Sequence, residues 1–418
     1  MAKANPDPLV FPVPAGVSPA ADLLTQTLRE GAQRMLASAV EAEVADYLAV
    51  RSHITDARGH RQVVRNGHLP TREILTGVGK IEVTQPRVHD RREPGEREKF
   101  TSKFLPPYLR KAKNMEELIP WLYLKGISTS DMSEALQALV GPAAAGLSAS
   151  TVSRLKESWE QEFATWNRRS LEGKKYVYVW ADGVYFNLRL GEDRVCVLVL
   201  MGATDDGTKE LIGVSDGYRE SEQSWSALLL DVKKRGLTMD PKVATGDGSL
   251  GFWAALRKVF PKTSEQRCWV HKSANVLDKL PKRLQAQAKD KLHQIWMAPT
   301  KKAAHQAFDL FVSTYQAKYP GSAECLKKDR DVLLTFYDFP AEHWMHIRTT
   351  NPIESTFATV RLRHDKTRNN GSRVACLTMV FKLLENAALS WRKLNCSNLL
   401  PAVVAGTIYE DGIQKAAA

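Results

Sequence analysis

Three carboxylates stand out because each lies where an acid does not help to build a core. Asp182 interrupts the apolar run VYVWADGVYF, and Asp247 ends the run KVATGD. Glu354 follows in the first turn of a segment that begins NPIES. An unpaired buried carboxylate is costly, so such acids usually meet a cation. Brought together, three of them would bind two Mg²⁺ ions about 4 Å apart, an arrangement that serves phosphoryl transfer.

Each acid also has a purely structural interpretation. Asp182 precedes Gly183 and would suit an Asp-Gly hairpin turn. Asp247 would cap a helix that starts near Ser249, and Glu354 would favour the positive end of its own helix. The joint order of strand acid, strand-end acid and helix acid favours the metal site over three separate coincidences.

A cysteine and a histidine follow the second acid at a spacing typical of metal ligands. Cys268 and His271 form a Cys-x-x-His pair, which can be half of a zinc site. No second pair with zinc spacing follows, so a structural zinc is disfavoured. We expect the pair to lie at the end of the strand EQRCWVH, near Asp247, where it would shape the active site or contact DNA.

The elements that must position these residues belong to a mixed α/β sheet. The segments KKYVYVWADGVYFNLRL, RVCVLVLMGATDDGTKELIGVSDG and PKVATGDG are β-branched and aromatic runs bounded by turns, and SEQSWSALLLDVKKRG is an amphipathic helix. Residues 272–345 have helical periodicity throughout. Asn351 and Pro352 predict a helix start just before Glu354.

The N-terminal third has a different character. A Pro-rich tail precedes a predicted helix over residues 20–49, which suggests a packing or dimerisation face. Residues 51–113 predict a small basic β-rich element with the strands REILTGV and KIEVTQP. A solvated charged face is the alternative to DNA binding here. The arginines that would meet phosphates are Arg61, Arg65, Arg72, Arg87, Arg91 and Arg92.

Residues 114–170 predict several helices, and the last two resemble a helix-turn-helix. A turn with Gly141 and Pro142 precedes a helix that opens with SAST. In such a motif the second helix enters the major groove and its first residues reach base edges. An ordinary helix bundle is the alternative. The candidate DNA contacts on this helix are Ser150, Thr151, Arg154 and Lys156.

Composition restricts the class of protein. The chain has 418 residues and a formal net charge of +12, which points to a polyanionic partner such as nucleic acid. Five scattered cysteines fit a reducing compartment rather than a disulfide framework. We see no signal-peptide pattern and no apolar run as long as a membrane span. These features predict a cytoplasmic protein with no membrane partner.

The catalytic block resembles the bacterial Mutator-type transposases, the IS256 family. The family signature combines a strand-end Asp, a Gly-apolar pair and a Gln-x-Cys-x-x-His element. WADGVYF and TTNPIESTFATVR resemble the first and last catalytic blocks of the same family. The signature positions are filled here by Asp247, Gly251, Phe252, Val259, Phe260, Pro261, Thr263, Gln266, Cys268 and His271.

This resemblance implies a fold and an activity. It implies an RNase H-like catalytic core with an Asp-Asp-Glu triad of Asp182, Asp247 and Glu354, interrupted by an all-helical insertion. The core would occupy residues 171–271 and 346–418, the insertion 272–345, and N-terminal DNA-binding modules, with a tail and helix over 1–50, would precede them. Gly246 and Gly248 would then let backbone and DNA approach closely.

The implied reaction is Mg²⁺-dependent cleavage and strand transfer at terminal inverted repeats, without a nucleotide cofactor. Mn²⁺ is the expected substitute metal. Members of the family are thought to move through a circular copy-out and paste-in intermediate. We expect a nucleoid-associated bacterial homodimer, and a silent DNA-binding regulator or a metal-dependent nuclease remains the alternative. Basic residues around the third acid would contact the DNA backbone: Arg348, Arg361, Arg363, Lys366 and Arg368.

Overall fold

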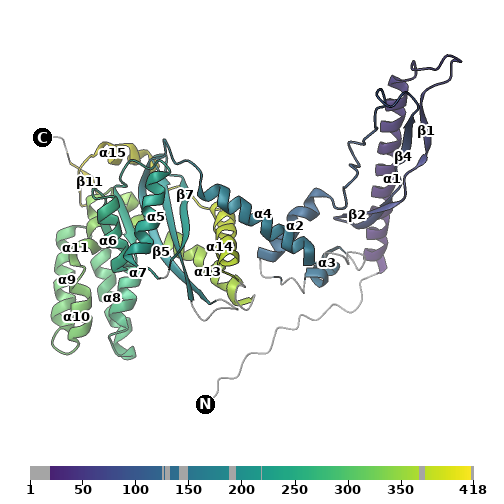
Figure 1. The fold of residues 1–418 in the computed structure, drawn as a ribbon. Coiled ribbons are helices and arrows are strands. Elements are labelled where there is room, and N and C mark those ends of the chain that lie inside the picture. The colour runs from purple at the N-terminus through teal and green to yellow at the C-terminus, as the bar shows by residue number, and fades with distance from the viewer. Residues whose placement is uncertain are drawn as a thin grey trace. The chain divides into compact units, whose positions relative to one another are not determined.

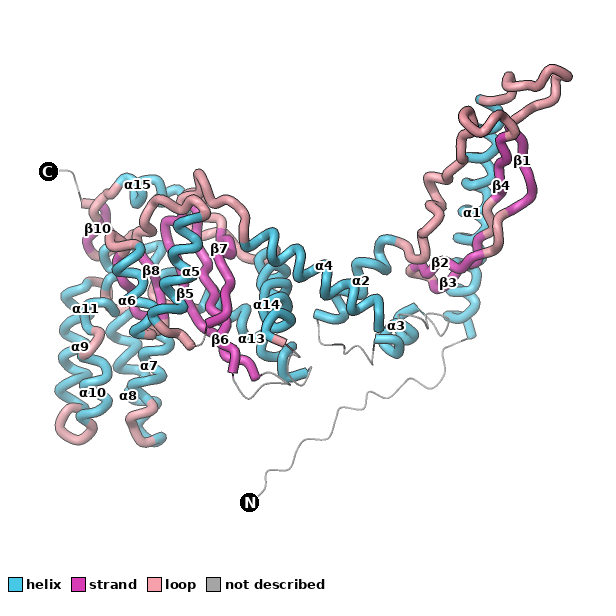
Figure 2. The backbone as a smooth tube through the Cα atoms, in the orientation of Figure 1, coloured by secondary structure: helices cyan, strands magenta, loops and turns pink. Residues whose placement is uncertain are grey.

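The computed structural model describes residues 19–124, 127, 132–140, 149–187, 194–217, 219–366 and 372–415. The chain divides into two compact units, Met1–Val152 and Ser153–Ala418. Figures 1 and 2 show the helices and strands of each unit. Each unit has hydrophobic clusters of its own. None of the helices in the described ranges is long and apolar enough to cross a bilayer.

The N-terminal unit is built on one long helix and two small antiparallel sheets. Helix α1 (Pro19–Val50) packs against strand β3 (Gly79–Val83), which pairs with β2 (Arg72–Thr76). Strand β1 (Val63–His68) pairs with β4 (Pro86–Asp90). The predicted helix over residues 20–49 and both predicted strands of the β2–β3 hairpin are therefore confirmed.

Alternation explains why the β2–β3 hairpin packs on the helix. Ile81 and Val83 are buried, whereas Glu82 between them is exposed. Because successive strand residues face opposite sides, one face of the hairpin is apolar. That face meets Val40 of α1 and Leu105 of the following loop. The hairpin and the helix therefore share one small core.

Two further helices complete the core of this unit. Helices α2 (Lys113–Leu124) and α3 (Met132–Val140) contribute Met115, Ile119 and Leu136 to a cluster with Leu75 of β2. Helix α4 (Ala149–Asn167) corresponds to the predicted second helix of the helix-turn-helix. Residues 141–148, with Gly141 and Pro142, lie outside the described residues, so the motif stays a prediction.

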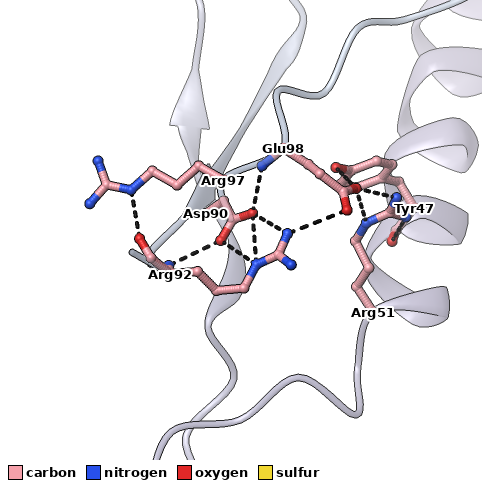
Figure 3. A network of polar contacts seen from close by, with 6 residues as sticks. All are labelled: Tyr47, Arg51, Asp90, Arg92, Arg97 and Glu98. Atoms are coloured by element: carbon pink, nitrogen blue, oxygen red, sulfur yellow. Dashed lines mark hydrogen bonds and ion pairs between the residues drawn. The ribbon is translucent and has the colours of Figure 1, made fainter. Parts of the chain in front are cut away.

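A polar network joins the end of β4 to α1 (Figure 3). Asp90, whose side chain is 4% exposed, accepts hydrogen bonds from the guanidinium and backbone N–H of Arg92 and from the N–H of Glu98. The carboxylate of Glu98 in turn accepts from Arg51 at 2.6 Å and from Tyr47. These bonds hold the pKa of the Asp90 carboxyl well below its usual range.

The C-terminal unit is organised by one five-stranded mixed sheet with the order β7-β6-β5-β8-β9. Strand β5 (Tyr176–Asn187) pairs antiparallel with β6 (Arg194–Thr204), which pairs antiparallel with β7 (Lys209–Gly217). On its other side, β5 pairs parallel with β8 (Val243–Gly246), and β8 pairs parallel with β9 (Ser264–Arg267). The predicted mixed α/β sheet is confirmed.

The central strands are apolar along almost their whole length because helices cover both faces of the sheet. Helices α5 (Glu222–Lys234) and α6 (Leu250–Val259) pack on one face, where Val179 and Ala181 are buried. On the opposite face, the indole N–H of Trp180 donates to the carbonyl of His346. The alternation along β5 therefore continues to Asp182, on the same face as Trp180.

After β9 the chain is helical as far as the third acid. Helices α7 (Trp269–Leu277), α8 (Lys282–Trp296), α9 (Lys301–Tyr315) and α10 (Pro320–Lys327) come first. Short turns of helix at α11 (Arg330–Leu333), η2 (Thr335–Asp338), η3 (Ala341–His343) and α12 (Trp344–Ile347) lead to α13 (Asn351–Lys366). Residues 272–345, all of them described, contain no strand, as predicted.

One local prediction was wrong. The strand predicted over EQRCWVH ends at Arg267, because the N–H of Cys268 bonds to Gly246 and the next N–H, of Trp269, bonds to Arg348 outside the sheet. Beyond α14 (Arg373–Ala388) and α15 (Leu400–Ala405), the chain continues into a hairpin of β10 (Tyr409–Glu410) and β11 (Ile413–Gln414). Its turn, Asp411-Gly412, has two positive φ angles, as a type I′ turn requires.

We expect Asp90→Asn to loosen the N-terminal unit locally. The Asp90 carboxylate accepts hydrogen bonds from Arg92 and from the N–H of Glu98, and the substitution removes its negative charge. These bonds should weaken, because hydrogen bonds to a charged group are stronger than those to a neutral one. Hydrogen exchange of the full chain should show at least about tenfold faster exchange in peptides spanning residues 86–98. Because the Asp90 pKa is depressed, the contribution is present above the usual carboxyl pKa of about 4 and is lost only as the pH falls below it.

The exposed pair of Lys80 and Glu73 provides the control for this experiment. Glu73→Gln should leave exchange nearly unchanged, because surface ion pairs contribute little. Equal exchange rates in the Asp90→Asn and wild-type proteins would contradict the role assigned to Asp90.

Candidate active site

The first acid lies in the middle of the central strand. Asp182 stands opposite Val199 of β6, and β5 runs on to Asn187, so no hairpin turn forms at Asp182-Gly183. The carboxylate is 5% exposed and accepts the N–H of Gly183 at 2.9 Å. Burial raises the pKa of the Asp182 carboxyl to about 7; the nearby carboxylates of Asp247 and Glu354 add to the rise, and His271 opposes it.

The second acid is brought beside the first by strand register. In the parallel pairing of β5 with β8, Ala181 is the partner of Gly246, so the residue that follows each of these partners is an aspartate. Asp247 also accepts the N–H of Ser249, which caps α6, at 2.8 Å. The N-cap of α6 is therefore Ser249 rather than Asp247, and one oxygen of Asp247 orders the turn before it.

The glycines that flank Asp247 have an intramolecular reason. A Cβ on Gly246 would come within 3.0–3.2 Å of the rings of Phe252 and Trp253. Gly248 has φ +90°, and a Cβ there would lie 2.0 Å from the guanidinium carbon of Arg267. These two close contacts require glycine within the fold itself, and the expectation that the glycines also let DNA approach stays a prediction.

The third acid lies at the start of α13, after the helical segment. Glu354 lies in the first turn of α13, with a side chain that is 25% exposed. Its Oε1 accepts the hydroxyl of Thr350 at 2.6 Å and lies 3.4 Å from Nδ1 of His271. Because Glu354 raises the pKa of Asp182, the helix acid and the two strand acids act on one another.

Cys268 and His271 lie on α7 rather than on a strand. Cys268 is fully buried at the N-cap of α7, and His271 follows in the first turn. Burial lowers the pKa of the His271 imidazole, but Cys268 and the carboxylates of Asp182 and Glu354 outweigh it and raise the pKa to about 9. The expectation that the pair would lie near the acids is therefore met by the geometry, although through a helix.

A fourth acid was missed by the sequence analysis. Glu220 lies just before the N-cap of α5, and its side chain packs against Gly183. Together with Asp247 and Tyr185 it lines a pocket of about 420 Å³. Burial raises its pKa to about 7, with Asp247 and Asp182 acting in the same direction. Its only signal in the sequence is a place before a helix cap, which many surface acids share.

A buried charged cluster that was also missed lies beside the second acid. Arg267 and Lys272 are 5% and 3% exposed, and both contact the carboxylate of Asp329, at 3.2 and 2.6 Å. Two cations on one carboxylate leave net positive charge near Gly248 and Asp247.

Among the described residues, only Cys268, His271 and Glu354 have donor atoms close enough to one another to share a metal, and the acids of the site add further oxygen atoms around them. The carboxylates of Asp182, Asp247, Glu354 and Glu220 are hard oxygen ligands of the kind that Mg²⁺ and Mn²⁺ prefer. Cys268, His271 and Glu354 also offer sulfur, nitrogen and oxygen atoms that all lie within 4.8 Å of one another. Glu354 belongs to both groups of residues.

The predicted DNA-contacting arginines fall into two groups. Arg65 forms a two-bonded ion pair with Glu41, Arg72 donates to the carbonyls of Leu105 and Pro107, and Arg92 is held by Asp90. Arg348 donates to the carbonyl of Trp296, and Arg363 is only 2% exposed. These side chains serve the fold, because nearby acceptors or burial engage them. Arg65 is exposed despite its ion pair, and the other exposed members are Arg61, Arg87, Arg91, Arg154 and Arg361.

Some predicted contacts are beyond structural description. The side chains of Ser150, Thr151 and Lys366, and the whole of Arg368, lie outside the described residues. Lys156 is half-buried on α4.

Comparison with known proteins gives one consistent result. A family model described as "Transposase, Mutator family" matches residues 18–394. The transposase for insertion sequence element IS6120 of Mycolicibacterium smegmatis is 48% identical over 298 residues, covering 71% of this chain and 92% of that protein. The transposase for IST2 of Acidithiobacillus ferrooxidans is 50% identical over 290 residues, covering 68% and 95%. The transposase for IS256 in transposon Tn4001 of Staphylococcus aureus is 28% identical over 330 residues, covering 78% and 80%.

Asp182→Asn should stabilise the metal-free protein at pH 8. The carboxyl has a pKa of about 7 when folded and about 4 when unfolded, so this group costs the folded state stability as the pH rises from about 4 to about 7. Asparagine carries no charge and avoids that cost. Thermal unfolding in EDTA should show a midpoint about 3–6 °C above wild type at pH 8 and a smaller gain at pH 5.

Asp206→Asn is the matched control with the opposite sign. Hydrogen bonds from Lys393, Thr204 and Thr208 hold the pKa of Asp206 below its usual range, so its charge stabilises the folded state. The control should lower the midpoint at pH 8. A midpoint for Asp182→Asn at or below that of wild type would refute the electrostatic description of the site.

Proposed function

Because the chain belongs to the Mutator family of transposases, we propose that it is the DNA transposase of an insertion sequence, with Asp182, Asp247 and Glu354 as an Asp-Asp-Glu triad. The parallel register of β5 and β8 is the observation that carries this proposal. It sets two of the acids side by side, and α13 brings the third within electrostatic range of Asp182. The mixed sheet, with a helical segment between the second and third acids, supports an RNase H-like core.

The acids fit divalent cations. Asp182 is buried and each neighbouring carboxylate raises its pKa, so the cluster is electrostatically unfavourable without positive charge. The Oε2 atom of Glu220 is shielded from water and has no hydrogen-bond partner. Two Mg²⁺ ions, with Mn²⁺ as a substitute, would supply the charge that neutralises a phosphate during attack and departure. Asp182, Asp247 and Glu354 would hold them.

The reaction proposed for this site has two steps. Water attacks the phosphodiester at the transposon end, and the bond to the 3′ oxygen breaks and leaves a 3′-hydroxyl. That hydroxyl then attacks a phosphate of another strand, and one phosphodiester replaces another, so no nucleoside triphosphate is consumed. The triad orients the reacting oxygens, and the imidazolium of His271 offsets charge beside Glu354. Transfer between the two ends of one element would give the circular copy-out intermediate.

DNA recognition is proposed to combine surface arginines with the predicted helix-turn-helix. The exposed arginines of the N-terminal unit, Arg61, Arg87 and Arg91, are positioned for phosphate contacts, and Arg361 lies on α13 close to the proposed active site. We further propose that the terminal inverted repeats are the specific ligand and that a homodimer in the nucleoid brings two ends together.

Removing one acid should separate binding from chemistry. Asp182→Asn, Asp247→Asn and Glu354→Gln should each lower cleavage and joining by about 10²-fold or more, because groups that stabilise a transition state contribute at least that much. Binding to a duplex that carries the element's end should change by less than about threefold. Gel analysis of labelled duplex in Mg²⁺, with EDTA as a blank, measures both.

Glu222→Gln is the control, because Glu222 lies close to Glu220 in the chain but is exposed and pairs with Lys258. It should retain wild-type activity. Nicked ends that are never joined would indicate a nuclease, and tight binding without any product would indicate a regulator.

The exposed arginines should bind DNA phosphates. Removing one arginine–phosphate interaction should reduce the slope of log affinity against log salt concentration by about 0.9. Alanine at both Arg87 and Arg91 should therefore lower the slope by about 2 in a fluorescence-anisotropy titration with duplex DNA. Arg65→Ala should change it less, because Glu41 holds that side chain. Identical slopes for the wild-type protein and both variants would exclude this surface from DNA binding.

A further inference from the structure

We propose that the Cys268–His271 pair is a positioning element that fixes the carboxylate of Glu354 through the hydroxyl of Thr350. This inference rests on the proposed function, because it assigns the pair to the third acid of the triad. The observation behind it is a convergence of three side chains on one buried hydroxyl. Thr350 itself is completely buried.

The distances define Thr350 as the centre of this arrangement. Its Oγ1 lies 2.6 Å from Oε1 of Glu354, 3.3 Å from Sγ of Cys268 and 3.4 Å from Nδ1 of His271. A hydroxyl has one proton, and the shortest contact is to a carboxylate oxygen, so that proton is donated to Glu354. The oxygen of Thr350 is then left as an acceptor for the thiol or the imidazole.

Backbone bonds make the hydroxyl a fixed point. The N–H of Thr350 donates to Sγ of Cys268 at 3.3 Å, so the thiol contacts both polar groups of the threonine. The N–H of Cys268 donates to the carbonyl of Gly246, the residue before Asp247. The N–H of Trp269 donates to the carbonyl of Arg348, just before Thr350. The start of α7 therefore connects the strand end that carries Asp247 to the turn that carries Glu354.

His271 makes a second contact with the carboxylate of Glu354. Its Nδ1 lies 3.4 Å from Oε1 of Glu354, the same oxygen that Thr350 contacts. One carboxylate oxygen thus accepts a hydrogen bond from Thr350 and lies at ion-pair distance from His271, whereas Oε2 of Glu354 makes neither contact. Two such restraints select one orientation of an otherwise flexible glutamate side chain.

The same atoms could instead enclose a transition metal, since Cys268, His271 and Glu354 offer three donors close together. The hydroxyl of Thr350 decides between the two possibilities. It lies within hydrogen-bond distance of all three groups and already donates to Oε1 of Glu354. We therefore assign the cluster to hydrogen bonding.

The test compares Thr350 with a second buried threonine, Thr245. Thr350→Val removes the hydroxyl with little change of shape, and Thr350→Ser restores it. Thr245→Val is the matched control, because Thr245 is equally buried and its hydroxyl donates to the carbonyl of Ile347 without touching an acid. Both valine variants should lower the thermal midpoint, and Thr350→Val by the larger amount, since its hydroxyl is bonded to a charged carboxylate.

The readouts are strand transfer and Mn²⁺ affinity of the full-length protein in a titration without DNA. Thr350→Val should lower the transfer rate about 10- to 100-fold, the ratio expected for losing a hydrogen bond to a charged group. It should also weaken Mn²⁺ binding about tenfold. Thr350→Ser should recover most of both losses, and Thr245→Val should show neither.

Three results would overturn the proposal. The first is a Thr350→Val protein with the transfer rate and Mn²⁺ affinity of Thr245→Val, and the second is a folded Thr350→Ser protein that is as impaired as Thr350→Val. The third is stoichiometric zinc in the purified wild-type protein that disappears in Cys268→Ala. Wild-type activity in Glu354→Gln would instead overturn the proposed triad itself, so the two failures are distinguishable.

Discussion

A parallel pairing of two strands governs the rest of the C-terminal unit. With Ala181 beside Gly246, the residues that follow these two partners are both acids, at the edge where β8 ends. Neither strand can slip by one residue, because a slip would turn the apolar face of β5 away from α5 and α6. The position of the acids is therefore maintained by hydrophobic packing on the far side of the sheet. The chemistry depends on a core in which the acids take no part.

Gathering carboxylates in this way costs stability, and the surroundings are arranged to limit that cost. Asp182 and Glu220 both have pKa values raised to about 7, so the metal-free site retains protons that isolated acids would release. The imidazole of His271 supplies positive charge nearby. The glycines on either side of Asp247 serve the same close packing, because side chains there would collide with aromatic rings or with Arg267.

The N-terminal unit shows why a basic composition does not identify contact residues. Arginines that look equivalent along the sequence have different surroundings once the chain folds. Arg92 is bound by a buried carboxylate and Arg72 by backbone carbonyls, whereas Arg87 and Arg91 remain exposed. A guanidinium that already has acceptors within the fold gains less from a phosphate. The net charge thus indicates a polyanion, and the tertiary structure selects the arginines that can meet it.

The sequence by itself determined the elements and the order of the acids. Periodicity placed the strands, the helical segment over residues 272–345 and the start of α13, because these depend on local patterns of apolar residues and caps. Only the tertiary structure decided that helix α7 begins at Trp269 and that Glu220 lies beside Asp247. It also decided that Thr350 links Cys268 to Glu354. Thr350 and Cys268 are 82 positions apart, and nothing in a local pattern encodes which distant partner a polar side chain will meet.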